Sequence, residues 1–237
     1  MVDKPEYMKR EICRFGRRLS EQNLSILAWG NLSMIDRDGD LIAIKPSGAH
    51  LSEMSPDDIP LVRFSTSDII DGANRPSVDM PIHMEIYKTF KDIGAIIHMH
   101  SPFCTIFAQA GKPIECLGTT HADHFKGDIP IIDVTSTIHD DPGFESETGK
   151  AIIRSFTERD IDPIEIGACL VKYHGPFVWG RDIETAFENA VVLERIAFMN
   201  YHTLKLSEQN EMPNVIKKRH FERKNGIRAY YGQNKRR

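Results

Sequence analysis

Apolar residues recur at two spacings along this chain, and the spacings predict a mixture of helices and strands. Over residues 4–23 they lie three or four positions apart, at Met8, Ile12, Phe15 and Leu19, as on the buried face of an amphipathic helix. Further helices are predicted over residues 83–91, 102–110, 145–160, 182–206 and 213–225, with Asp182 as the N-cap of the longest. Short apolar runs between turn residues predict strands over residues 26–35, 41–45, 61–64, 94–100, 129–132 and 168–173. This mixture is typical of an α/β sandwich built on one sheet.

The organisation of the chain is that of one globular domain. No internal repeat and no linker rich in Gly, Ser or Pro divides the 237 residues, so a single domain over residues 1–237 is predicted. Residues 93–111 carry no Asp, Glu, Lys or Arg and are long enough to suggest a membrane span. The two His, the Pro and the Gln within them indicate instead a buried strand, a turn and a helix. No membrane partner is therefore expected.

The N-terminus and the cysteines both favour a cytoplasmic protein. Charges are dense over the first ten residues, and the apolar stretch of a signal peptide is missing. The four cysteines are scattered, without a Cys-x-x-Cys pair, at positions 13, 104, 116 and 169. That pattern fits free thiols in a reducing compartment better than a disulfide framework.

Charge is distributed unevenly. The net charge is −4, but residues 217–237 hold nine Lys or Arg and one acid, which is +8 and leaves −12 for the rest. A basic tail of this kind is able to bind nucleic acid. Here Phe221, Ile227, Tyr230 and Tyr231 interrupt the basic residues. We therefore predict a tail that docks on an acidic neighbouring surface, and no nucleic-acid partner.

A candidate metal site begins with His98 and His100, which follow an apolar run. Residues i and i+2 of a strand share one face, so the two imidazoles are expected to stand side by side. His174 ends a second apolar run, and Asp79 supplies an upstream carboxylate. Three His and a carboxylate suit a zinc-like ion. The alternative is a hydrogen-bonded polar edge of the core.

Three other groups of residues have a functional and an ordinary interpretation. Residues 30–33 (Gly-Asn-Leu-Ser) and 45–48 (Lys-Pro-Ser-Gly), with Ser77, offer the glycines, donors and cation of an anion cradle, or else they form plain turns. Asp123, in a polar loop over residues 118–123, is a candidate general acid or base, or a turn residue. Tyr231 is a candidate for proton transfer, or one of two packed aromatic residues.

Eight short segments occur in an order that resembles the class II aldolase/epimerase family, and most closely its L-ribulose-5-phosphate 4-epimerases. They are Gly-Asn-Leu-Ser (30–33), Lys-Pro-Ser-Gly (45–48), Arg-Pro-Ser (75–77), Ile-His-Met-His-Ser (97–101), Gly-Thr-Thr-His-Ala-Asp (118–123), Glu-Thr-Gly (147–149), His-Gly-Pro-Phe (174–177) and Ala-Tyr-Tyr-Gly-Gln (229–233). The resemblance runs nearly from end to end.

The resemblance implies a three-layer α/β/α sandwich around a central, mixed and predominantly antiparallel sheet. It implies a divalent metal, zinc first with Mn²⁺ or Co²⁺ as alternatives, held by Asp79, His98, His100 and His174. It implies a sugar-phosphate cradle formed by Asn31, Lys45, Ser47, Gly48 and Ser77, with Thr119 lining the same site.

The resemblance also implies catalytic groups that two subunits share. Asp123 and Tyr231 match the family's two acid/base residues, and His220 matches a histidine near the tyrosine. Family members supply that tyrosine from the adjacent subunit of a fourfold-symmetric homotetramer. The basic segment 213–237 is therefore expected to dock at a subunit interface.

The reaction so implied is metal-dependent 4-epimerisation of L-ribulose 5-phosphate to D-xylulose 5-phosphate, by retro-aldol cleavage and re-addition. One departure is Val78, which stands where the epimerases have a serine and so removes a hydroxyl donor from the cradle. The rival within the fold is a metal-dependent sugar-phosphate aldolase, although such aldolases place a catalytic Glu near the position of Asp79. A non-catalytic metal-binding assembly protein is a third hypothesis.

Overall fold

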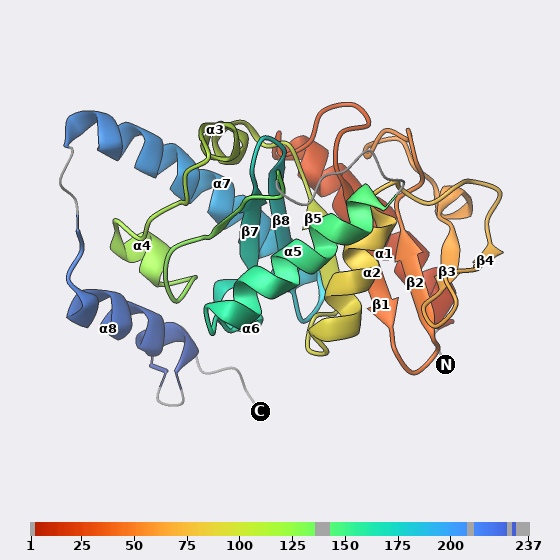
Figure 1. The fold of residues 1–237 in the computed structure, drawn as a ribbon. Helices are drawn as coiled ribbons and strands as arrows, with labels where there is room; N and C mark the ends of the chain where they lie inside the picture. Colours follow the sequence, from red (N-terminus) through yellow and green to blue (C-terminus); the bar gives the residue numbers. More distant parts are fainter. Residues whose placement is uncertain (1–2, 136–142, 208–210, 227–228, 231–237) are drawn as a thin grey trace.

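A computed structural model describes residues 3–135, 143–207, 211–226 and 229–230. At its centre is one eight-stranded sheet, and helices surround that sheet (Figure 1). The strands lie in the order β4 (Ile69–Asp71), β3 (Leu61–Arg63), β2 (Leu41–Ile44), β1 (Asn31–Asp36), β5 (Ala95–His98), β8 (Gly175–Gly180), β7 (Ala168–Val171) and β6 (Ile131–Ile132). Neighbouring strands are antiparallel except β6 and β7, which are parallel. The expected mixed, predominantly antiparallel sheet is confirmed.

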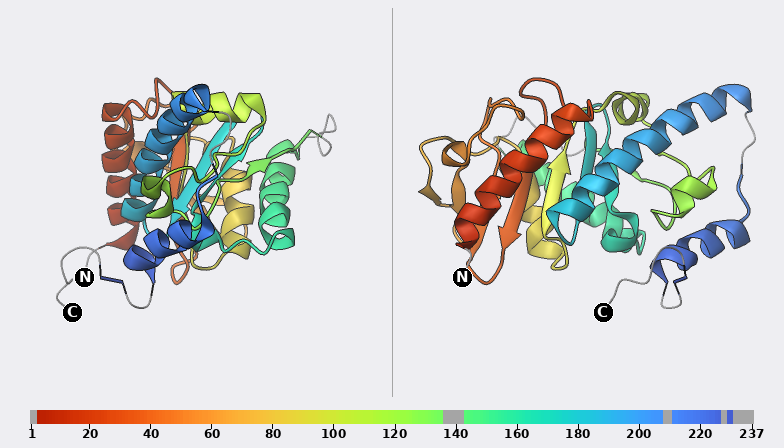
Figure 2. Two further views of the ribbon diagram at one scale, coloured as in Figure 1. Left: turned by 90° about the vertical axis from the view of Figure 1, so that its left-hand side faces the viewer. Right: turned by 180° about the vertical axis from the view of Figure 1, so that it is seen from behind.

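Helices cover both faces of this sheet (Figure 2). On one side lie α1 (Lys4–Glu21), α3 (Pro102–Ala110) and α7 (Ile183–Leu206), and on the other α2 (Met80–Thr89) and α5 (Phe144–Glu158). The short elements are η1 (Pro56–Asp58), α4 (Thr119–Ala122) and α6 (Pro163–Ile166). The last helix, α8 (Asn214–Asn225), packs on α4 away from the sheet. In the described part of the chain, no helix combines the length and hydropathy needed to cross a bilayer.

The helix predictions hold because burial follows the helical period. Met8, Ile12, Phe15 and Leu19 of α1 are all 0% exposed, so the predicted stripe is its core face. Asp182 caps α7 as expected, with its carboxylate accepting the backbone N–H of Thr185. The uncharged run 93–111 forms β5, a turn and α3.

The sequence interpretation differs from the structure at several places. Residues 26–30 form a loop and not the start of a strand, with Leu27 (φ 56°) and Gly30 (φ 73°) both in left-handed conformations. Residues 119–122 of the predicted polar loop form the helix α4. Strand β8 was not predicted, because Gly-Pro at its start and Gly at its end leave only three consecutive large apolar residues.

The strand register brings a row of residues to one end of the sheet. Asn31 of β1 pairs with His98 of β5, and His98 pairs in turn with Phe177 of β8. The turn between β7 and β8 places His174 next to this row. Three strands and one turn therefore converge where the sequence analysis expected a metal.

Candidate active site

Nine of the predicted site residues line one cavity of about 250 Å³. They are Asn31, Lys45, Ser47, Gly48, Ser77, Asp79, His98, His100 and His174. Thr119, Asp123 and His220 do not line it. Tyr231 lies outside the described residues. The structure thus gathers the metal and cradle candidates and separates the acid/base candidates from them.

The three histidines present nitrogen atoms to a common point. Their candidate ligand atoms all lie within 4.8 Å of one another. Nε2 of His98 and Nε2 of His100 are 3.1 Å apart, although His100 lies two residues beyond the end of β5. Nitrogen ligands at about 2.0–2.1 Å around a tetrahedral zinc are roughly 3.3 Å from each other, so this separation fits one shared ion.

Protonation also favours metal binding. Burial lowers the pKa of His98 well below its ordinary value, and the neighbouring His174 and His100 lower it further. Burial likewise lowers the pKa of His100 and of His174. Nδ1 of His98 lies 3.0 Å from the carbonyl oxygen of Pro176, which only an N–H is able to satisfy. The lone pair of His98 is therefore on Nε2, which faces the other two imidazoles.

Asp79 lies beside this group at the N-cap position of α2, although the ligand atoms that share one point are those of the three histidines. Its Oδ2 lies 3.9 Å from Nε2 of His98 and accepts a hydrogen bond of 2.6 Å from Nδ2 of Asn31. This bond orients both side chains and leaves Oδ1 of Asn31 as an acceptor that is buried without a partner among the described residues. A ligand hydroxyl would satisfy that oxygen.

The cradle consists of two loops held together by backbone hydrogen bonds. Ser47 N–H donates to the carbonyl of Arg75, and Ser77 N–H donates to that of Lys45. Lys45 is 2% exposed, and its Nζ donates to the carbonyls of Ala28 (3.1 Å) and Pro46 (3.3 Å). Burial lowers the pKa of Lys45 to about 8, with Asp79 opposing the shift. The cradle therefore holds a desolvated cation suited to a phosphate.

Val78 lines the same cavity and is 66% exposed. An apolar side chain so exposed offers a ligand bulk and no hydrogen bond. Val78, the position at which the resembling epimerases have a serine, therefore lies directly beside the cradle.

Asp123 is engaged by α8 of its own chain. Arg223 binds both carboxylate oxygens, from Nε at 2.8 Å and Nη2 at 2.6 Å, and Nδ1 of His220 lies 3.0 Å from Oδ1. Burial alone would raise the pKa of Asp123, but the bonds from Arg223 and His220 outweigh it and lower the pKa. Asp123 therefore stays ionised, with His220 held beside it. The sequence analysis did not single out Arg223, since nothing local links it to Asp123.

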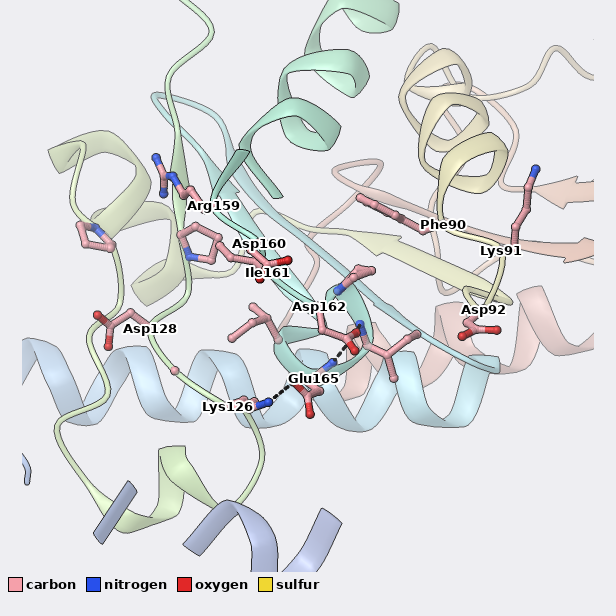
Figure 3. Close-up of a pocket in the computed structure, with 16 residues that line it drawn as sticks. Phe90, Lys91, Asp92, Lys126, Asp128, Arg159, Asp160, Ile161, Asp162 and Glu165 are labelled. Atoms are coloured by element: carbon pink, nitrogen blue, oxygen red, sulfur yellow. Dashed lines mark hydrogen bonds and ion pairs between the residues drawn. The ribbon is translucent and has the colours of Figure 1, made fainter. Parts of the chain in front are cut away.

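A larger cavity of about 1060 Å³ lies at the other end of β7, between α6 and the loop around Lys126 (Figure 3). Its lining contains no histidine or cysteine among the described residues. Lys126 is paired with Glu165 at 2.6 Å, and Asp162 caps α6. Lys126 and Glu165 are thus engaged with each other, and Asp162 is engaged with backbone N–H groups of α6. Size alone therefore does not make this cavity the active site.

Gly30 is required by the geometry of the site. Its φ is +73°, and a Cβ there would lie 2.4 Å from the carbonyl oxygen of His98. Gly48 has a similar φ of +74°, but a Cβ at that position would meet none of the described atoms within 4 Å. We expect Gly30→Ala to lower the free energy of unfolding by about 3 kcal/mol or more, from backbone strain plus the clash. Gly48→Ala, which meets only the strain, should cost about 1 kcal/mol in the same urea titration. Equal effects of the two variants would contradict the clash.

Fold and site together define an α/β protein in which three histidines of one cavity could hold a divalent metal. Residues 10–201 match the model of the Class II Aldolase and Adducin N-terminal domain. The chain belongs to this family. Class II aldolases use a divalent metal, and the histidine group of this chain could hold one.

Solved structures share the fold. An L-fuculose 1-phosphate aldolase matches with 24% identity and a TM-score of 0.78, over 94% of this chain and 97% of that one. YgbL from Klebsiella pneumoniae, described as a putative aldolase/epimerase/decarboxylase, matches with 24% identity and a TM-score of 0.73, over 91% and 98%. An aldolase II superfamily protein from Pseudomonas syringae matches with 14% identity and a TM-score of 0.75, over 94% and 86%. Their names span several reactions, so the fold alone does not choose among them.

Proposed function

We propose that this protein is a metal-dependent epimerase that inverts C4 of L-ribulose 5-phosphate to give D-xylulose 5-phosphate. The observation that carries the proposal is the single cavity in which His98, His100 and His174 face Asp79 beside the Lys45 cradle. Three imidazoles and a carboxylate suit a divalent metal, zinc above all, with Mn²⁺ or Co²⁺ as alternatives. The cradle suits the phosphate of a ketopentose phosphate.

The chemistry follows from the substrate. The hydrogen on C4 is not acidic, so inversion requires cleavage of the C3–C4 bond and re-addition to the other face of the aldehyde. A bound divalent cation supplies Lewis acidity for the charge that develops as this bond breaks. Lys45, Ser47 and Ser77 hold the phosphate, so the aldehyde fragment turns without leaving. Oδ1 of Asn31 accepts a hydrogen bond from a substrate hydroxyl.

Inversion needs a proton-transfer group on each side of the substrate. We assign these roles to Tyr231 and to Asp123 with His220. Because Asp123, His220 and Thr119 do not line the cavity of their own chain, we propose that they serve the cavity of a second copy. The surface beside the cavity supports such docking, since Trp29 is 55% exposed and Tyr173 is 63% exposed.

The proposed arrangement is a homotetramer in which segment 213–237 docks on a neighbour. The charges support it, because nine basic residues in 217–237 face a remainder with net charge −12. A single domain over residues 1–237 then consists of the sandwich and this docking segment.

A sugar-phosphate aldolase is the second candidate, since several structures that share the fold carry that name. Asp79 supports the choice of the epimerase. Its Oδ2 is held by Asn31 and lies near His98, where it serves as a ligand and not as a free base. A non-catalytic metal-binding protein would bind the ion without turnover.

The test is to incubate zinc-loaded protein with L-ribulose 5-phosphate and follow the products by NMR, with a chelator-treated sample alongside. We expect D-xylulose 5-phosphate, and we expect the chelator to abolish its formation. Accumulation of a two-carbon aldehyde phosphate without epimer would establish the aldolase instead. Bound metal with no product of either kind would overturn both.

A further inference from the structure

One buried aromatic ring contacts two of the three candidate ligands. Phe177 of β8 is 0% exposed and pairs with His98 in the strand register. Its ring lies parallel to the His98 imidazole, with centroids 4.3 Å apart and planes 16° apart. The same ring meets His174 nearly edge-on, at 6.0 Å and 79°. Phe177 therefore borders ligands that come from two separate segments of the chain.

Behind Phe177 lies a histidine that the proposed reaction does not use. His83 is 0% exposed and stands on α2 one turn after Asp79, whose carbonyl accepts its backbone N–H. The His83 ring meets Phe177 at 6.1 Å and 75°. Its Nδ1 lies 2.7 Å from Oγ of Ser33 on β1. The side chain is thus fixed between the helix that carries Asp79 and the strand next to His98.

We infer that Phe177, backed by His83, is a positioning residue that sets the orientation of the metal ligands. The bond from Nδ1 of His98 to Pro176 fixes one edge of that imidazole, and the face of Phe177 prevents the ring from tilting. His83 ties this stack to α2, so the carboxylate of Asp79 and the imidazole of His98 are held by one connected support. Outer groups of this kind tune the affinity and geometry of a metal site.

His83 contributes by position and not by charge. Burial lowers its pKa to about 3, so the imidazole stays neutral at any pH at which the protein works. Ser33 also lies 2.8 Å from the hydroxyl of Tyr87, which donates to the Ser33 carbonyl. The contact from His83 to Ser33 therefore belongs to a buried network that joins α2 to β1.

If Phe177 were only a core residue, its replacement would lower the stability of the protein without changing metal binding. Phe156 is a matched control for this distinction. Phe156 of α5 is also 0% exposed and packs on Trp179, two residues along the same strand, at 5.3 Å. Among the ring contacts of the described residues, Phe156 meets none of the three histidines. Phe177→Leu and Phe156→Leu each replace a buried phenylalanine of this core by leucine, so the two variants lose the same side-chain atoms.

The experiment uses the full chain loaded with Co²⁺, whose visible absorption reports coordination geometry, and measures affinity by competition with a chelator. We expect Phe177→Leu to weaken metal binding about 10- to 100-fold and to shift the absorption bands. Phe156→Leu should leave both unchanged at a comparable loss of thermal stability. A folded Phe177→Leu protein with the affinity and spectrum of the unsubstituted protein would overturn the inference.

His83→Gln provides a second, smaller change should Phe177→Leu not fold. It removes the ring against Phe177, and we expect the same direction of change in affinity and spectrum. Unchanged values would overturn the inference. The inference rests on the metal site of the proposed function and not on the reaction. Failure of the unsubstituted protein to bind Co²⁺ would therefore contradict the metal site itself. Variants with unchanged Co²⁺ affinity and spectrum would contradict only the positioning role of Phe177 and His83.

Discussion

Replacing His98 by asparagine is expected to remove the metal and the activity together. His98 is fully buried, presents Nε2 to the other two imidazoles, and is fixed by Pro176 and Phe177. An asparagine is too short to place a donor at the same point. Loss of Lewis-acid stabilisation worth several kcal/mol corresponds to a fall in turnover of about a thousandfold or more.

The measurement is metal content by elemental analysis together with turnover on the same sample. His202→Asn is the control, since this exposed histidine packs on aromatic rings of α7 and α3, away from the cavity. We expect the control to keep both metal and activity. Normal metal content in folded His98→Asn protein would refute the ligand role.

Replacing Tyr231 by phenylalanine is expected to abolish epimerisation while the metal and the fold remain. The substitution removes a single hydroxyl from the segment that we propose to enter a neighbour's site. Loss of one positioned acid or base costs about 10²- to 10⁴-fold in rate. Tyr230→Phe is the matched control, because the adjacent Tyr230 lines a separate hollow on α8 and is 70% exposed.

Steady-state rates of both variants, measured at equal metal content, test this role. We expect Tyr231→Phe to lose kcat and Tyr230→Phe to stay within about twofold of the unsubstituted protein. Near-normal turnover of Tyr231→Phe would remove this residue from the mechanism.

Much of the site was predictable because local sequence patterns mark its residues. His98 and His100 end an apolar run, and the two loops at Lys45 and Ser77 contain the glycine, proline and serine of tight turns. Strand pairing then brings the two loops together, as the isolated bridge between Pro46 and Pro76 shows. Local patterns were sufficient to find these cavity residues because each of them lies at or near the end of a predicted strand or helix.

Other features were not predictable because they depend on contacts between distant residues. Asp123 and Arg223 are 100 positions apart, and neither has a local pattern that points to the other. Strand β8 has only three large apolar residues between Gly-Pro and Gly, so its sequence alone indicates a turn, and its place in the sheet depends on pairing with β5 and β7. The support of His98 by Phe177 follows from register, which the sequence alone does not set.

The geometry of Asp123 also refines the expected acid/base roles. Bidentate pairing with Arg223 keeps this carboxylate ionised, while Nδ1 of His220 is held 3.0 Å from Oδ1. Because this carboxylate is ionised, Asp123 holds no proton to donate within the proposed function. Arg223 therefore contributes to the positive charge of the docking segment and also fixes the ionisation state of Asp123.

The central claim is that the metal cavity of one copy and the C-terminal segment of another form one catalytic site. The most direct measurement is the activity of hybrid tetramers that contain both His98→Asn and Tyr231→Phe chains, co-expressed with different tags and purified through both. Each variant alone is expected to be inactive. In a hybrid, the intact cavity of a Tyr231→Phe chain can combine with the intact tyrosine of a His98→Asn chain. We predict that the hybrids recover about one quarter of the specific activity of the unsubstituted protein. Hybrids no more active than either variant alone would contradict the shared site.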